Sequence, residues 1–439
     1  MDYTRDEVLS FVQENDVKFV RLAFCDLFGR SRNIAIMADE LPRAFHGGVS
    51  FDASAVPGFM KIQESDLFLQ PDPATLAVLP WRPQQGRVAR LLCDVHRPDG
   101  KLFEGGTGRE LLRSTVQEAY DMGLSCQVGV ECEFYLFQMD EAGCPTHIPQ
   151  DRAGYLDMAP KDKGENVRRE ICLMLEQMGI QPESCHHEAG PGQNEIVLRH
   201  TGALEAADWV ATLKPLIRAV AARNGLHACF LPKPLPDFSG SGMHINMSLF
   251  TAGGNLFRVG GEQHSPQAES FIAGILRRAV ELTALLNPMP NSYQRLGQHE
   301  APGFVSWSHQ NRSQLIRIPA AQGEYARMEL RSPDPSCNPY LAIALLLKAG
   351  LQGIEDGLPL EQSSRLDLYS AGDGETARYA RLPQTLLEAV EAAEQSAFVQ
   401  QALPQRARET LFAAQRAACQ KAVPCQGRGA PLEDLLFDI

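Results

Sequence analysis

The sequence predicts an α+β fold with two domains, the larger of which carries an antiparallel sheet. The chain has 439 residues, which is more than one small hydrophobic core usually serves. Stretches with helical spacing interleave with stretches that read as strands, and these strands are short and rich in turn residues. Short, turn-rich strands favour an antiparallel sheet over a doubly wound parallel one.

The first hundred residues read as strands and turns that follow a short helix. Residues 1–15 have the spacing of an amphipathic helix with a polar start, which is unlike a signal peptide. A hairpin is expected over residues 17–37, with its turn at residues 26–30. Further strands are expected at residues 74–81 and 86–96.

A helix then opens the second domain. It is expected to begin near Gly106, with Thr107 as its N-cap, and to end near Gly123. We place the domain boundary just before this helix, at residues 103–106, so the predicted domains are residues 1–104 and 105–439.

The rest of the chain mixes both kinds of element. Helices are expected at residues 166–179, 206–225, 346–357 and 382–397. Short strands are expected at residues 131–137, 194–200, 227–232, 242–250, 314–320 and 326–332.

Composition excludes several classes of function. The net charge of −13 argues against a nucleic-acid binder, since phosphate contacts need a surplus of Lys and Arg. No apolar run approaches the roughly 20 residues that a membrane span needs. The 11 cysteines form no CxxC pair, and Cys25, Cys93, Cys132 and Cys172 lie in apolar runs. Free buried thiols in a reducing cytosol follow from this pattern, so we expect a cytoplasmic protein.

Two acidic residues interrupt an apolar strand at VGVECEFYLF, residues 128–137. Glu131 and Glu133 are two residues apart and therefore share one face of the expected strand. An edge strand with its polar face in water would explain them. A functional site is the alternative, because the same oddity recurs elsewhere: the other acids and the histidine in strand-like settings are Glu188, Glu195, His244 and Glu329.

Burial of so many charges is costly unless something compensates them. A lone strand histidine such as His244 is usually a core residue. Together with five glutamates, however, it makes a site for two Mg²⁺ or Mn²⁺ ions plausible, because these metals prefer carboxylate oxygens whereas zinc more often recruits cysteine. Paired metals of this kind clamp phosphoryl groups.

Arginines form a second group of candidate functional residues, which are Arg295, Arg312, Arg317, Arg327 and Arg331. Isolated arginines usually make surface salt bridges. Here Arg327, Glu329 and Arg331 alternate on one expected sheet face, which suits bidentate capture of phosphate and carboxylate groups. The sequence has neither a P-loop nor a GxGxxG motif.

These residues carry a resemblance to a known family. The stretches VRLAFCDLFGR, FDASAVPGF, VECEFYLF, CHHEAGPGQNEI, GSGMHINMSL, NSYQRLGQHEAP, NRSQLIRIP and RMELRSPDPSCNPYLAIA come in the order found in class I glutamine synthetases. The chain resembles the short form of that family, without its regulatory insertion, over nearly its whole length.

The resemblance implies an N-terminal β-grasp domain, a catalytic domain with a curved antiparallel sheet flanked by helices, and a dodecamer of two hexameric rings with active sites between subunits. It implies that Glu133, Glu188 and Glu195 hold one metal ion and that Glu131, His244 and Glu329 hold the second. The residues it implies for glutamate are Gly240, Arg295, Glu300, Arg312 and Arg331. Those it implies for ATP are Glu183, Asn246, Ser248, Arg312, Arg317 and Arg327.

The implied reaction is ATP-dependent ligation of ammonia to L-glutamate through γ-glutamyl phosphate. Asp52, Tyr155 and Glu188 match the ammonium pocket, and Asp52, Glu300 and Arg312 match catalytic positions. Ala55, Ser239, Asn246 and the segment 295–300, which is one residue short, depart from the family pattern. A ligase for a larger amine, such as a polyamine or ethanolamine, is therefore the alternative, and a catalytically silent relative is a remote one. Short-form relatives also bind transcription repressors, so such a partner stays open.

Overall fold

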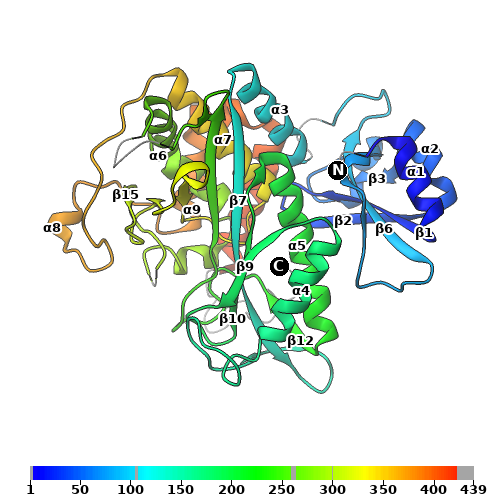
Figure 1. Ribbon diagram of the computed structural model, residues 1–439. Coiled ribbons are helices and arrows are strands. Elements are labelled where there is room, and N and C mark those ends of the chain that lie inside the picture. The colour runs from blue at the N-terminus through cyan, green and yellow to red at the C-terminus, as the bar shows by residue number, and fades with distance from the viewer. Residues whose placement is uncertain (1–2, 104–106, 259–263, 299, 423–439) are drawn as a thin grey trace.

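The computed structural model describes residues 3–103, 107–258, 264–298 and 300–422, and Figure 1 shows a smaller N-terminal domain beside a larger one. The elements of the N-terminal domain are α1 (Arg5–Glu14), β1 (Val17–Cys25), β2 (Ser31–Met37), α2 (Leu41–Gly47), β3 (Val49–Asp52), β4 (Asp66–Pro71), β5 (Ala77–Val78) and β6 (Arg87–His96). The predicted boundary at residues 103–106 and the predicted helix start at Gly106 fall partly outside the described residues, and the division at residue 104 stays a prediction.

The N-terminal sheet has the strand order β2-β1-β6-β4-β3, and β5 also pairs with β6. The predicted hairpin is confirmed, because β1 and β2 are antiparallel and the buried carboxylate of Asp26 accepts hydrogen bonds from the amides of Phe28 and Arg30 within the turn. The expected strand at 74–81 is wrong for most of its length, since residues 73–75 form a 3₁₀ turn and only Ala77–Val78 pair. One pair of this sheet, β1 with β6, is parallel.

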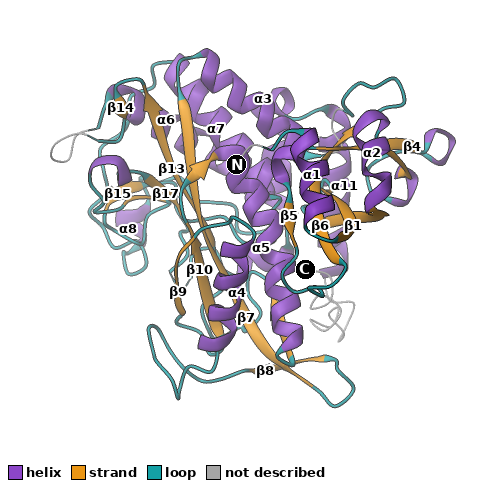
Figure 2. Ribbon diagram, turned by 45° about the vertical axis from the view of Figure 1, so that its right-hand side comes forward, coloured by secondary structure: helices purple, strands orange, loops and turns teal. Residues whose placement is uncertain are grey.

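The larger domain is built on one large sheet. Its strands are β7 (Ser125–Met139), β8 (Pro145–Pro149), β9 (Pro182–His187), β10 (Gln193–Leu198), β11 (Thr201–Gly202), β12 (Leu226–Cys229), β13 (Met243–Thr251), β14 (Gly254–Asn255), β15 (Trp307–His309), β16 (Ile316–Ile318) and β17 (Met328–Leu330). The strand order is β15-β16-β17-β13-β7-β10-β9, and every pair along it is antiparallel except β15 with β16. Figure 2 shows the long strands β7 and β13 side by side.

Helices make the main hydrophobic core together with this sheet. They are α3 (Gly108–Asp121), α4 (Glu165–Gln177), α5 (Ala203–Arg223), α6 (Pro266–Leu286), α7 (Pro339–Glu355), α9 (Leu386–Gln395), α10 (Ala397–Ala402) and α11 (Gln405–Ala422), and the short α8 (Asp373–Thr376) lies outside that core. Cys172, on α4, is partly exposed, so it is not the buried thiol that its apolar sequence context predicted. Thr107 occupies the N-cap position of α3 as predicted, but its hydroxyl makes no capping hydrogen bond. Among the residues described, no helix is long and apolar enough to cross a membrane.

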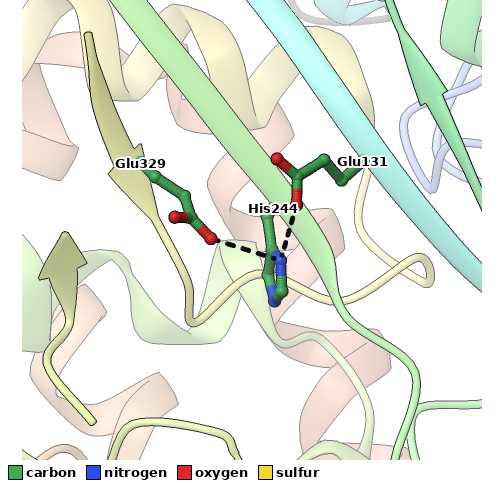
Figure 3. A group of neighbouring side chains, drawn as sticks. All are labelled: Glu131, His244 and Glu329. Carbon is green, nitrogen blue, oxygen red and sulfur yellow. Dashed lines mark hydrogen bonds and ion pairs between the residues drawn. The ribbon is translucent and has the colours of Figure 1, made fainter. Parts of the chain in front are cut away.

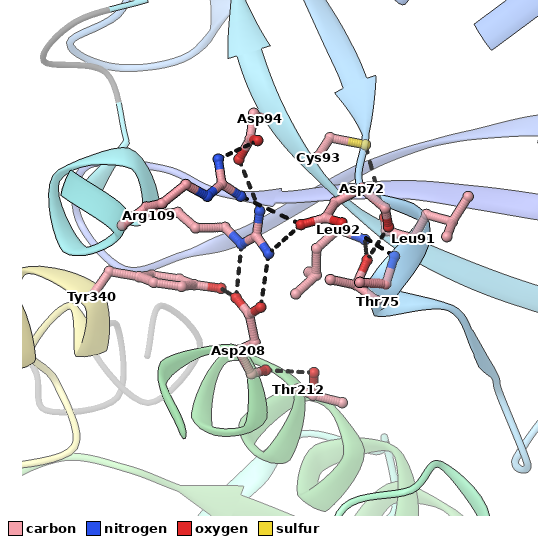
Figure 4. Close-up of polar contacts among 12 residues, drawn as sticks. Asp72, Thr75, Leu91, Leu92, Cys93, Asp94, Arg109, Asp208, Thr212 and Tyr340 are labelled. Carbon is pink, nitrogen blue, oxygen red and sulfur yellow. Dashed lines mark hydrogen bonds and ion pairs between the residues drawn. The ribbon is translucent and has the colours of Figure 1, made fainter. Parts of the chain in front are cut away.

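The two domains are joined by a buried cluster of charges, the Arg109 cluster (Figure 4). We define it as Arg109 and Arg113 of α3, Asp72 and Asp94 of the N-terminal domain, and Asp208 of α5. Arg109 contacts Asp72 and Asp94 at 2.8 Å each, and its Nε lies 2.9 Å from Asp208. The hydroxyl of Tyr340, on α7, also donates to Asp208.

A second contact between the domains is made by the tip of the β1–β2 hairpin. The side-chain amide of Asn338 donates to the carbonyls of Asp26 and Leu27. Gly29 has φ +80° and a Cβ there would lie 2.9 Å from the Cα of Asn338, so only glycine fits this approach without strain. The N-terminal domain is therefore fixed against the start of α7 as well as against α3 and α5.

Candidate active site

Strand β7 carries Glu131 and Glu133 on one face and core residues on the other. Cys132 and Phe134 alternate with them and are fully buried in the main hydrophobic core. β7 is an internal strand that pairs with β13 on one side and β10 on the other, and Glu133 is only 8% exposed. An edge strand with its polar face in water is thus excluded as the explanation for the two acids.

Neighbouring strands add ionisable side chains to this same face, since directly paired residues of adjacent strands point the same way. The pairs are His186 with Glu195, Glu195 with Glu133, Glu131 with His244, and Asn246 with Glu329. We call this set of side chains, together with Glu188, the acidic face. Its members come from β7, β9, β10, β13, β17 and the loop after β9, so segments almost 200 residues apart meet here.

His244 lies at the centre of one group of ligand atoms (Figure 3). Its Nδ1 is 3.2 Å from Glu131 and 3.5 Å from Glu329, and its Nε2 is 3.8 Å from Glu133. Glu131, His244 and Glu329 can each offer one atom to a common ion, and Glu133, Glu195 and His244 can do the same. The structure therefore brings these five predicted metal-site residues together.

A second group involves Glu188 and Glu195, with His186 between them. The Nε2 atom of His186 lies 2.9 Å from Glu188 and 3.8 Å from Glu195. The ring of Tyr155 meets the His186 ring edge-on at 5.6 Å between centroids. Sequence reasoning missed His186, although its place directly before His187 and Glu188, in the strand that pairs with Glu195, was the available signal.

Glu133 is held in place by two donors. The side-chain amide of Gln193 donates to it at 2.8 Å, and the backbone N–H of Gly242 donates at 3.0 Å to the same oxygen. Its other oxygen stays directed at the His244 ring. Gln193, another residue that the sequence did not single out, thus orients a carboxylate of the acidic face.

Charges on the acidic face are only partly compensated by the protein. Burial and the neighbouring carboxylates raise the pKa of Glu195 well above its ordinary value, and burial also raises the pKa of Glu133. Glu131 differs: burial opposes ionisation, but the hydrogen bonds from His244 and Asn246 hold its pKa down at about 2. Crowded carboxylates and an imidazole form the donor set that suits Mg²⁺ or Mn²⁺, so these residues fit divalent cations.

The arginines border this face, and two of them contact Glu329. Arg317 pairs with Glu329, and the Nε atom of Arg331 lies 3.3 Å from it. Arg295 is buried and donates to the carbonyls of Ser332 and Arg331. These cationic groups thus lie on the side of the face nearest β17.

Gly240 and Gly242 lie against Arg295. A Cβ at Gly242 would sit 2.6 Å from an Nη atom of Arg295, and one at Gly240 would meet the carbonyl of Pro232 at 2.3 Å. Only glycine allows the backbone to approach the guanidinium this closely. Gly240, predicted for glutamate, is thereby placed beside an arginine predicted for the same substrate.

Arg312 and Glu300 lie at the exposed side of the arginine group. The carbonyl of Arg312 accepts hydrogen bonds from Arg331 and, at 2.9 Å, from the hydroxyl of Tyr369. Burial raises the pKa of Tyr369 to about 12, and Arg331, Glu300 and Arg295 all act on it. Glu300 has φ +70°, an uncommon backbone conformation for a non-glycine residue. Tyr369 thus lies among residues that the resemblance assigns to glutamate: it is hydrogen-bonded to Arg312 and close enough to Arg331, Arg295 and Glu300 for their charges to affect its pKa.

Asn246, where the family pattern has histidine, bridges the acidic face and an arginine. Its amide N–H donates to Glu131 at 2.9 Å, and its oxygen accepts from Arg327 at 2.9 Å. Ser248 follows on the same face of β13 and is buried, whereas Glu183 is exposed on β9. His200, which the sequence did not single out, packs over Gly129, and its pKa is lowered by burial and by Arg327 while Glu183 and Glu131 act in the opposite direction.

Asp52 is not brought to the acidic face of its own chain. It lies exposed at the end of β3 in the N-terminal domain, and Figure 1 shows β3 apart from β7. Its carboxylate accepts from the amide and hydroxyl of Ser54, which lowers its pKa. Within one chain, the structure separates Asp52 from Tyr155 and Glu188.

Both parts of the chain match one protein family. Residues 106–423 match "Glutamine synthetase, catalytic domain" and residues 16–98 match "Glutamine synthetase, beta-Grasp domain". The chain is 45% identical over 406 residues to "Glutamine synthetase" of Clostridium saccharobutylicum, covering 91% of each chain. It is 46% identical over 405 residues to "Glutamine synthetase" of Methanosarcina mazei, covering 91% of this chain and 90% of that one.

Two solved structures share the fold of this chain. A structure titled "GmaS/ADP complex-Conformation 1" has a TM-score of 0.86 and 31% identity, covering 100% of both chains. "Apo GmaS without ligand" has a TM-score of 0.86 and 33% identity, covering 97% of this chain and 99% of that one. The fold and the acidic face thus define a two-domain ligase with a β-grasp domain and a catalytic domain. The chain belongs to the glutamine synthetase family, as its motifs predicted, and the predicted fold class is confirmed.

Proposed function

We propose that this chain ligates ammonia to L-glutamate with ATP, giving L-glutamine through γ-glutamyl phosphate. The observation that carries the proposal is the acidic face, where carboxylates from four separate segments and the His244 ring converge beside a group of arginines. Such an arrangement suits phosphoryl transfer, in which catalysis is mostly positioning and charge stabilisation. The family matches and the glutamine synthetase relatives support the same reaction.

In this proposal, Glu131, His244 and Glu329 hold one divalent ion, and Glu133, Glu188 and Glu195 hold a second. Mg²⁺ or Mn²⁺ bound there would neutralise charge on the phosphates of ATP. His244 separates the carboxylates of the first group, and Gln193 and Gly242 fix the direction of Glu133. The protein therefore supplies oriented donors before any ion binds.

Substrates are assigned to the residues around this face. Arg295 and Arg331 bind the carboxylate of glutamate beside Gly240, with Glu300 and Arg312 at the exposed side. Arg312, Arg317 and Arg327 act on the phosphates, and Glu183, Asn246 and Ser248 contact the nucleotide. The bridge that Asn246 makes between Glu131 and Arg327 gives this departure from the family pattern a role, because it couples a metal-site carboxylate to a phosphate-site arginine.

Ammonium must be bound as a cation and deprotonated before it attacks. We assign this task to Tyr155, Glu188 and an Asp52 supplied by a neighbouring subunit, because a chain's own Asp52 lies in the other domain. Glu300 shields the intermediate from water. This assignment requires a homo-oligomer with active sites between subunits, for which we propose the dodecamer of two hexameric rings that the resemblance implies.

A ligase for a larger amine is the second candidate. The structural neighbours titled GmaS, a γ-glutamylmethylamide synthetase, support it. So does Ala55, which replaces a serine of the family pattern on the turn that follows Asp52. The smaller alanine side chain leaves more room beside the exposed carboxylate of Asp52.

Phosphate release with ATP, Mg²⁺ and glutamate distinguishes the two candidates. We expect ammonium to stimulate release more strongly than methylamine, ethanolamine or putrescine do. Asp52→Asn should remove most of the ammonium stimulation, while Asp39→Asn, on an exposed 3₁₀ turn of the same domain, serves as the control. Stronger stimulation by one of the larger amines would replace ammonia with that amine. Phosphate release that no amine increases and that Glu133→Gln leaves unchanged would instead support a silent relative.

A further inference from the structure

Gln193, at the start of β10, is a fully buried glutamine that joins the acidic face to its surroundings. A glutamine side chain has two N–H donors and a carbonyl oxygen that can accept twice. Here Nε2 donates to Glu133 at 2.8 Å and to the carbonyl of Gly240 at 3.2 Å. Oε1 accepts from the amide of Gly190 at 2.8 Å and lies 3.3 Å from the hydroxyl of Tyr135. All four positions have a partner, so one orientation of the side chain satisfies them together.

The segment 240–242 is tied to Glu133 by more than this side chain. The backbone N–H of Gly242 donates at 3.0 Å to the Glu133 oxygen that Gln193 also bonds. The backbone N–H of Glu133 donates in turn to the carbonyl of Gly242 at 3.0 Å. Two direct hydrogen bonds and the bridge through Gln193 thus connect a carboxylate of the acidic face to this segment, and a movement of that carboxylate carries the segment with it.

Side chains also hold the residues that come just before this segment. Nζ of Lys233 donates to the carbonyl of Phe238, and the hydroxyl of Tyr135 donates to the carbonyl of Ser239. Together with the bond from Gln193, three successive carbonyls each accept a hydrogen bond from a buried side chain. The backbone here is therefore fixed by side-chain donors, and Gln193 joins it to the acidic face because its second N–H goes to a carboxylate there.

Gln193 also holds the turn that carries Glu188. Its backbone carbonyl accepts from the amide of Glu188 at 2.9 Å, and its backbone N–H donates to the carbonyl of Gly190 at 3.0 Å. A Cβ at Gly190 would lie 2.7 Å from Oε1 of Gln193 and 2.0 Å from the hydroxyl of Tyr135, so only glycine allows this turn. One residue therefore bonds to two glutamates proposed for a single ion and to the glycine proposed for the substrate glutamate.

We propose that Gln193 is a positioning residue that couples divalent-cation binding at Glu133 and Glu188 to glutamate binding at Gly240. The inference rests on the proposed function, which places an ion at the first position and glutamate at the second. Occupation of either position holds the network around Gln193 in its one fully bonded arrangement, which is the arrangement that the other position needs. The coupling is reciprocal, because each ligand raises the affinity for the other by the same factor.

Charge alone also favours the two ligands together, since a bound cation attracts the carboxylates of glutamate through space. That contribution does not depend on Gln193. The part of the coupling that a substitution of Gln193 removes is therefore the measure of its role.

Isothermal titration calorimetry on the full-length protein tests this inference without turnover. L-Glutamate is titrated in EDTA and again in saturating Mn²⁺, with no ATP present, and the ratio of the two dissociation constants is the readout. For wild-type protein we expect glutamate to bind about fivefold or more tightly in Mn²⁺. Gln193→Met keeps the length of the side chain and removes its hydrogen bonds, so the ratio should fall by about threefold or more.

Two further variants define the effect. Tyr135→Phe is milder, because it removes one hydroxyl and leaves the other bonds of Gln193, and its ratio should lie between those of wild type and Gln193→Met. Gln415→Met is the matched control, since Gln415 is a buried glutamine on α11 whose amide donates to the carbonyl of Ala284 at 2.6 Å. The control should lower the melting temperature and leave the ratio unchanged.

An unchanged ratio in Gln193→Met overturns the inference and leaves the proposed function standing. If Gln193→Met does not fold, an unchanged ratio in Tyr135→Phe has the same meaning. Equal binding of glutamate to wild-type protein in EDTA and in Mn²⁺ overturns the inference as well. Wild-type protein that binds no glutamate under either condition contradicts the proposed function itself, and the inference falls with it.

Discussion

The Arg109 cluster and the acidic face both bury several carboxylates, but only the Arg109 cluster pairs every one of its carboxylates with an arginine of the chain. Around Arg109, each of Asp72, Asp94 and Asp208 meets a guanidinium at 2.8 or 2.9 Å. On the acidic face, Glu133 and Glu195 meet another carboxylate and an imidazole, with no arginine between them. Buried carboxylates therefore join the two domains in the Arg109 cluster, whereas on the acidic face they form a set of donors that fits a cation.

The pKa values separate the two regions. Burial works against ionisation of Asp94, yet Arg109 and Arg113 hold its pKa below the ordinary value. Burial and neighbouring acids raise the pKa of Glu195 instead. A buried carboxylate with a lowered pKa has its counter-charge inside the fold, whereas a group of carboxylates with raised pKa values lacks one, which points to a cation from outside.

The sharpest test of this comparison is Glu133→Gln. Removing a carboxylate from the acidic face should reduce ATP-dependent phosphate release by about 100- to 1000-fold, because an oriented donor for the phosphoryl-transfer site is lost. The free energy of unfolding without metal should stay the same or rise, because the substitution removes a carboxylate that neighbouring carboxylates such as Glu188 repel. Glu324→Gln, at an exposed salt bridge with Arg258, is the control. A clear loss of metal-free stability in Glu133→Gln would show that both regions are structural.

Arg109→Met is the reciprocal change in the Arg109 cluster. It leaves buried aspartates without their shared partner and should lower the free energy of unfolding by about 3–5 kcal/mol in urea denaturation. Arg113→Met is the matched control, because Arg113 is partly exposed and should cost about 1 kcal/mol or less. Equal losses in both variants would contradict a central role for Arg109.

Added metal should stabilise the protein through the acidic face and not through the Arg109 cluster. Mn²⁺ at 100 times its dissociation constant should stabilise the native protein by about 2.7 kcal/mol, because it binds the folded acidic face and not the unfolded chain. Thermal unfolding with and without EDTA measures this difference. Glu195→Gln should reduce the stabilisation, and Asp94→Asn should leave it intact while lowering the melting temperature itself. A metal effect that survives Glu195→Gln undiminished would place the cation elsewhere.

A smaller effect is expected at Glu110, a partly buried carboxyl next to the Arg109 cluster. Burial raises its pKa from 4.5 to about 8, with Asp94 adding to the rise while the amide of Val95 and Arg113 oppose it. Between these pH values the folded chain keeps a proton that the unfolded chain has lost, so stability falls as pH rises. Wild-type protein should lose about 1 kcal/mol per pH unit in that window relative to Glu110→Gln. Parallel stability curves from urea titrations at several pH values would refute this.

The face that Glu131 and Glu133 share could be predicted from sequence, because side chains alternate along any strand. The residues that lie beside them on the neighbouring strands could not be predicted, because the pairing of β7 with β10 and β13 joins segments that are far apart in the chain. His186 and Gln193 were missed for this reason, and the resemblance to a family supplied the grouping that periodicity alone could not. The Arg109 cluster was invisible as well, because its residues lie in four unrelated segments, none of them unusual in composition. Family-implied roles for individual residues, including Asp52 and Glu300, stay predictions.

The rigid attachment of the N-terminal domain has an evolutionary consequence. Arg109 and Asn338 fix that domain to its own chain, yet on the proposed assignment its Asp52 serves a neighbour. Substitutions on the turn after β3, such as Ala55, can then alter which nucleophile is admitted while phosphate chemistry on β7 and β13 remains untouched. New amine preferences could thus arise in this lineage through substitutions in a small peripheral loop, while the strands that carry the acidic face keep their sequence.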